Sequence, residues 1–217
     1  MNDAPNLHEE NHGGHLHGGS EGALRRVAII VAIANLAYFC VEIAASQRIG
    51  SVSLFADSAD FLEDAAVNIL IVFALGWSLA ARARLGFGLA GIALLPALAA
   101  VWTAYLKLSG AGGVPDAAIL GLVGAGALVV NVGCAFLLAK HQHHGGSLGK
   151  AAYLCARNDA FANIAIIGAA LVTARWPSIW PDLVVGAAIF LLNLDAAKEV
   201  LEAARGEHAE TRGEVST

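Results

Sequence analysis

The most constraining feature of the chain is a group of acids inside an otherwise apolar helical segment, residues 53–70, SLFADSADFLEDAAVNIL. A carboxylate at the centre of a bilayer costs roughly 2.5–3.5 kcal/mol on insertion scales, so these acids must face a polar interior rather than lipid. At about 100° per residue, one narrow stripe of the helix carries Asp57, Asp60, Asp64 and Asn68. We call this stripe the acidic seam.

A second segment, residues 153–167, YLCARNDAFANIAII, repeats part of the seam. Its Cys155, Asp159 and Asn163 stand at the same four-residue intervals as the last three members of the acidic seam. Two helices with matching seams can face each other, and together they would supply three carboxylates and one thiol. Such a set suffices for a four-coordinate divalent cation with one softer ligand. The candidate metal ligands are Asp60, Asp64, Cys155 and Asp159.

Composition places the chain among integral membrane proteins. It has 217 residues, 57% of them hydrophobic and 14% charged, which is too apolar for an ordinary soluble domain and leaves room for about six helices of about 20 residues. The net charge of −5 comes largely from the polar ends and the seam, so no nucleic-acid partner is indicated. Three cysteines in apolar segments argue against a disulfide framework.

We therefore predict an all-α membrane protein with six transmembrane helices. The expected spans are residues 27–45, 54–81, 85–106, 117–139, 151–174 and 182–201. With a cytoplasmic N-terminus, the inner side would hold Arg25, Arg26, Arg82, Arg84, Lys140 and Lys150, and the outer loops only Arg48, Lys107 and Arg175. This asymmetry predicts that both termini are cytoplasmic. Around the spans we expect a disordered His-rich tail over 1–22, a transmembrane domain over 23–205 and a short polar tail over 206–217.

Several residues outside the four candidate ligands carry open alternatives. Accessory metal ligands could come from Asp57, Asn68, Asn163, His141, His143 and His144. The histidines of the tail and of the loop at 140–150 suggest weak metal capture, although a solvated tail and a basic inner loop explain them as well. Glu42 is either a residue at the outer mouth, a helix contact or a ligand. For Asn131 and Cys134 we favour contacts between helices.

Residues 25–205 resemble the cation diffusion facilitator family of divalent-metal exporters. The run SVSLFADSADFLED is similar to the second-helix motif of that family, and AAYLCARND to its fifth-helix motif. The resemblance implies a transport site in which Asp60 and Asp64 form the first pair and Asp159 belongs to the second. Cys155 stands where the family commonly has His, and a softer thiolate favours Zn²⁺ or Cd²⁺ over Mn²⁺. Family members typically continue into a cytoplasmic domain that this chain is too short to contain.

The resemblance implies export of a divalent cation, Zn²⁺ with Cd²⁺ as a second candidate, coupled to proton antiport. We expect no enzyme activity and no cofactor apart from the transported ion. The expected setting is the bilayer of a bacterial inner membrane, with a homodimer held by membrane helices or tails. A membrane protein that binds or senses metal without moving it remains an alternative, and an intramembrane aspartyl hydrolase using Asp64 and Asp159 is a weaker one.

Overall fold

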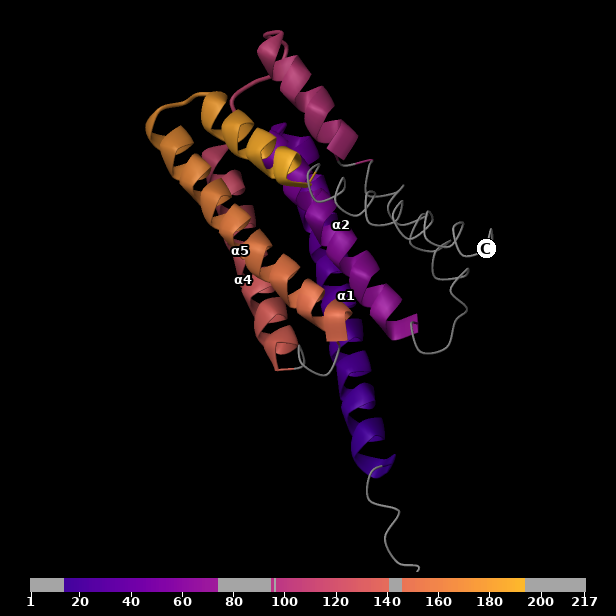
Figure 1. Ribbon diagram of the computed structural model, residues 1–217. Helices are drawn as coiled ribbons and strands as arrows, with labels where there is room; N and C mark the ends of the chain where they lie inside the picture. Colours follow the sequence, from indigo (N-terminus) through magenta and orange to yellow (C-terminus); the bar gives the residue numbers. More distant parts are fainter. Residues whose placement is uncertain (1–13, 74–94, 96, 141–145, 194–217) are drawn as a thin grey trace, which may run out of the picture.

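The computed structural model describes residues 14–73, 95, 97–140 and 146–193, and these ranges are helical without any strand. Four long helices are α1 (Gly14–Ile49), α2 (Val52–Phe73), α4 (Ala117–Ala139) and α5 (Gly146–Arg175), as Figure 1 shows. Two shorter apolar helices span Ala97–Leu108 and Trp180–Asn193. The predicted all-α class is confirmed.

Three of the helical segments are long and apolar enough to cross a membrane, namely Gly22–Ile49, Ala117–Ala139 and Ala152–Arg175. Large apolar side chains also cover their outer faces, with Leu122 and Leu171 77% and 69% exposed. Water would not tolerate so many exposed apolar groups, whereas lipid does. The chain is an integral membrane protein; six spans and cytoplasmic termini remain predictions.

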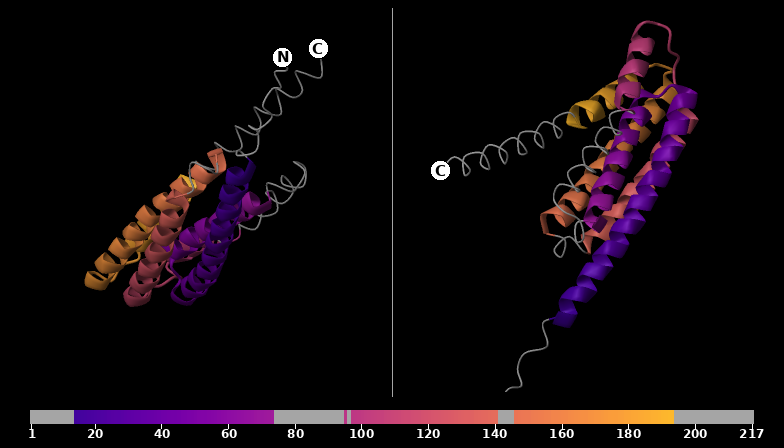
Figure 2. Two further views of the ribbon diagram at one scale, coloured as in Figure 1. Left: turned by 90° about the horizontal axis from the view of Figure 1, so that it is seen from below. Right: turned by 90° about the vertical axis from the view of Figure 1, so that its right-hand side faces the viewer.

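The long helices pack in a ring. α1 contacts α2 and α4, and α5 contacts α4 and α2. Close approach of α4 to α5 depends on Gly124, because a Cβ atom there would lie 2.9 Å from Cγ2 of Ile166. The first turns of α1 project beyond the other helices (Figure 1, Figure 2). This ring places the acidic seam of α2 next to α5, as the matching sequence patterns predict.

Glycines in the left-handed region end two of the helices. Gly50 has φ 62°, and the following Ser51 N–H donates to Ser46 O at 3.2 Å, which closes α1 with a Schellman motif. Gly110, with φ 80°, ends the Ala97–Leu108 helix in the same way. The turn at Gly50 brings α2 back antiparallel to α1 and directs the first turn of α2 into the protein.

The structure differs from the predicted boundaries at the N-terminus. α1 begins at Gly14, so residues 14–22, which we expected in a disordered tail, are helical. The N-terminal histidines at 8 and 12, the tail 206–217 and the histidines His141, His143 and His144 lie outside the described residues.

Candidate metal site

The acidic seam of α2 is buried. Asp57 and Asn68 are fully inaccessible, and Asp60 and Asp64 are 7% and 5% exposed. Glu63, which lies off the stripe, is exposed. The seam is therefore buried, as predicted. Leu54, Phe61 and Leu62 on the other faces of α2 are buried as well, so the burial is not confined to the acidic stripe.

Packing of α5 against α2 brings the second candidate pair to the seam. The Asp159 carboxylate interacts electrostatically with Asp60 and Asp64, and the Cys155 thiol interacts with Asp64. Asp159 is half-buried, and Cys155 is exposed. Within the described ranges, no three His, Cys, Asp or Glu side chains are arranged to hold a metal ion. The four candidates therefore lie in one region of the protein, but the described structure does not bring them together as a complete set of metal ligands.

A chain of side-chain amides links three helices beside the seam. Asn131 Nδ2 on α4 donates to Asn163 Oδ1 on α5 at 2.9 Å, and Asn163 Nδ2 donates to Asp57 Oδ2 on α2 at 2.6 Å. Both ends of the Asn163 amide are thus engaged in bonds between helices, which makes it a cross-link in this structure. The prediction that Asn131 mediates a helix contact is confirmed, and Cys134 likewise lies in a buried apolar cluster.

Glu42 of α1 is fully buried, so the alternative that it reaches solvent at the outer mouth is wrong. Among the residues that the structure describes, no N–H or O–H donor other than the two carboxyl groups themselves bonds the Glu42 oxygens or Asp57 Oδ1. Asp57 is the carboxylate with which Glu42 interacts most strongly. Sequence position suggested the end of a span, whereas the turn at Gly50 folds α2 over this part of α1.

Asn68 is the last residue of the acidic seam along α2. Its Nδ2 donates to the backbone oxygen of Asp64 at 2.8 Å, within the same helix. Its buried Oδ1 has no hydrogen-bond partner in the described part of the chain. Of the amides considered as accessory ligands, Asn68 is therefore the one with a free carbonyl oxygen.

Asn193 is a residue of the site that the sequence reasoning did not identify. It ends the described part of the Trp180–Asn193 helix, and its Nδ2 donates to Asp60 Oδ1. One oxygen of a candidate metal ligand is thus held by a neutral donor from another helix. An Asn within an apolar span was a visible signal, but nothing in the sequence paired it with α2.

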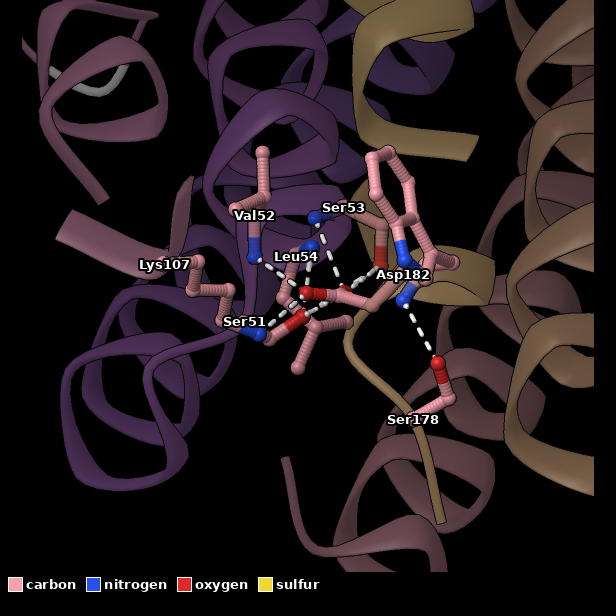
Figure 3. A network of polar contacts seen from close by, with 8 residues as sticks. Ser51, Val52, Ser53, Leu54, Lys107, Ser178 and Asp182 are labelled. Carbon is pink, nitrogen blue, oxygen red and sulfur yellow. Dashed lines mark hydrogen bonds and ion pairs between the residues drawn. The ribbon is translucent and has the colours of Figure 1, made fainter. Parts of the chain in front are cut away.

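Asp182 forms the centre of a second polar network at the start of α2 (Figure 3). Its Oδ1 accepts from Ser51 Oγ at 2.6 Å, Ser53 Oγ at 2.7 Å and Ser53 N at 3.1 Å. Its Oδ2 accepts from Val52 N at 2.9 Å and Lys107 Nζ at 2.8 Å. The carboxylate therefore caps the N-terminus of α2, where backbone N–H groups lack partners within the helix.

Lys107 was expected among the basic residues of the outer loops. It lies instead in the Ala97–Leu108 helix and is 2% exposed. Its pairing with Asp182 explains how a charged side chain is accommodated there. The loop assignment was wrong because the polar turn begins only at Ser109.

Comparison with known families bears on what this arrangement does. The model of the cation efflux transmembrane domain matches residues 28–205, which include every helix just described except the first turns of α1. No individual curated protein matches the chain significantly. The matched region contains both candidate pairs and both polar networks. The chain belongs to the cation efflux family and is a divalent metal cation transporter of the cation diffusion facilitator kind.

Proposed function

We propose that the protein exports Zn²⁺, with Cd²⁺ as a second candidate cargo, in exchange for protons. The observation that carries the proposal is the burial of Asp60 and Asp64 one turn apart on a helix that packs against the Asp159-bearing α5. A lipid-embedded protein that keeps several acids in its interior needs a cationic partner for them. A cation efflux domain supplies that partner as its cargo.

The exchange follows from the chemistry of the proposed ligands. Carboxylates and a thiolate bind a metal ion only when they are deprotonated. Protons that reach the site from outside therefore displace the metal. The protonated site is nearly neutral, so the protein returns to its inward-open state at lower electrostatic cost. Alternating exposure of the site would come from movement of α2 and α5 relative to their neighbours.

Cys155 sets the proposed metal preference. Thiolate is a soft ligand that favours Zn²⁺ and Cd²⁺ over Mn²⁺. Its exposed position on α5 would let it close over an ion bound to Asp64 and Asp159. Weak capture by the loop histidines and a homodimer in a bacterial inner membrane are further parts of the proposal.

The test is Zn²⁺-driven proton flux in proteoliposomes. We expect Asp64→Ala and Asp159→Ala to abolish the flux and Cys155→His to change the ratio of Zn²⁺ to Cd²⁺ transport. Asn35→Leu is the matched control, because Asn35 is a buried residue of α1 without a hydrogen bond to any candidate ligand. Full flux in both Asp variants would disprove the ligand set. Tight Zn²⁺ binding without flux in the unmodified protein would instead favour a binding or sensing role.

A further inference from the structure

The Trp180–Asn193 helix is attached to α2 at both of its ends. Asp182 near its beginning binds the first turn of α2, and Asn193 at its described end binds Asp60. These two attachments restrict rotation and sliding of the Trp180–Asn193 helix along α2. The position of the Asn193 amide is therefore set by tertiary packing as well as by its own side-chain rotamer.

The contact at the first turn is made through backbone atoms. A Cβ atom on Gly186 would lie 2.8 Å from Ser53 N and 2.8 Å from Val52 C, so the two helices meet without an intervening side chain. Asp182 adds hydrogen bonds to Val52 N at 2.9 Å and Ser53 N at 3.1 Å. Such backbone-to-backbone contact leaves little freedom at this end of the helix.

At the other end of the helix, the chemistry of the two side chains fixes which one donates the hydrogen bond. A carboxylate accepts hydrogen bonds and an amide nitrogen donates them, so Asn193 presents its Nδ2 to Asp60 Oδ1. Asp60 is 7% exposed, so water has little access to that oxygen. With Oδ1 engaged by Asn193, a metal ion would bind Asp60 through Oδ2.

We propose that Asn193 is a positioning residue that keeps Asp60 a one-oxygen ligand and thereby favours small, four-coordinate cations. The inference rests on the proposed function, in which Asp60 binds the transported metal. Four-coordinate Zn²⁺ needs one oxygen per carboxylate, whereas larger ions gain from carboxylates that bind through both oxygens. Hydrogen bonds from outside the coordination sphere typically change metal affinity by about 10- to 100-fold when they are removed.

The experiment measures Zn²⁺ and Cd²⁺ affinity of the full chain in detergent, by competition with a chromophoric chelator. Asn193→Leu removes the donor while keeping the approximate volume, and Asn193→Gln keeps an amide. Asn35→Leu is the control, since it makes the same change at a buried Asn that does not bond a candidate ligand. The absorption spectrum of bound Co²⁺ reports coordination geometry in each variant.

We expect Asn193→Leu to weaken Zn²⁺ binding about 10- to 100-fold, to weaken Cd²⁺ binding less and to shift the Co²⁺ spectrum toward higher coordination number. Asn193→Gln should restore part of the Zn²⁺ preference. Zn²⁺ affinity equal to that of Asn35→Leu, or an equal loss for both ions that Asn193→Gln does not reverse, would overturn the inference.

Asp60→Ala separates this inference from the proposed function. If Asp60→Ala binds Zn²⁺ as tightly as the unmodified protein, the proposed ligand set is wrong. If Asp60→Ala loses Zn²⁺ and Asn193→Leu does not, only the positioning role of Asn193 is wrong.

Discussion

Lys107 Nζ lies 2.8 Å from Asp182 Oδ2, although 75 residues separate them and both side chains are almost completely buried. Removing two charges from solvent costs several kcal/mol per ion unless hydrogen bonds satisfy the remaining groups. Asp182 meets that condition through four further bonds from Ser51 and from the first two residues of α2, whose N-terminal dipole also favours a negative charge. The result is one point at which three helices are joined.

Lys107→Met should destabilise the protein by about 3 kcal/mol, because it leaves the Asp182 carboxylate buried without its counter-charge. Thermal and chemical unfolding in detergent would measure the change. Lys140→Met is the control: Lys140 is exposed and stands 4.6 Å from the centroid of the Phe136 ring. We expect Lys140→Met to destabilise the protein by about 1 kcal/mol or less. Equal loss in both variants would show that the buried ion pair adds no specific stability.

Gly186→Ala should lower stability by about 1–3 kcal/mol, because the added methyl group meets the backbone of Ser53 and Val52. Gly168→Ala is the matched control, since a Cβ atom at Gly168 of α5 meets nothing within 4 Å. The control should be neutral or slightly stabilising, because Ala favours helix over Gly. The stability of each variant is measured from its unfolding midpoint in the same detergent. An unchanged midpoint for Gly186→Ala would contradict the close helix contact.

Asn163→Leu should destabilise more than Asn131→Leu. The first variant removes the donor to the buried Asp57 carboxylate, and the second leaves only a neutral amide oxygen without its donor. Hydrogen bonds to charged groups contribute about 1.5–3 kcal/mol and neutral ones about 0.5–1.5 kcal/mol. Parallel unfolding measurements on the two variants show which one loses more stability. The reverse order would mean that Asp57 is not a charged acceptor of this bond.

Zn²⁺ should protect Cys155 from alkylation by a maleimide and leave Cys40 unprotected. Both side chains are exposed, and Cys134 is buried, so single-cysteine variants can be compared directly. At free Zn²⁺ about ten times Kd, only about one site in ten is empty, and the Cys155 reaction should slow about tenfold. Mass spectrometry over time gives the rates. Protection of both thiols would indicate a global change of shape, and protection of neither would remove Cys155 from the ligand set.

Much of the candidate site could be predicted from residue spacing. The burial of the acidic seam followed from solvation, because carboxylates are costly in lipid. The burial of the other faces of α2 did not follow from the spacing of the acids. The same reasoning predicted the helix contact of Asn131, because an amide in an apolar span seeks a partner on another helix.

The remaining contacts depend on which helices become neighbours. Lys107 looked like a loop residue because its partner Asp182 lies 75 residues away on another helix. Asp182 and Asn193 had no visible partner because they bind groups at the start of α2 and on α2 itself. The sequence left Glu42 open between the outer mouth, a helix contact and a metal ligand, because its depth depends on how α2 folds back over α1.

Sequence alone therefore determined the helical class, the membrane environment and the acidic face of α2, all of which follow from local periodicity and the cost of charge in lipid. Only the tertiary structure decided that Asp182 caps α2, that Lys107 neutralises it and that Asn193 holds Asp60. Hydrogen bonds and ion pairs act over about 3 Å, so they are set by the packing of distant segments, which spacing along the chain does not specify.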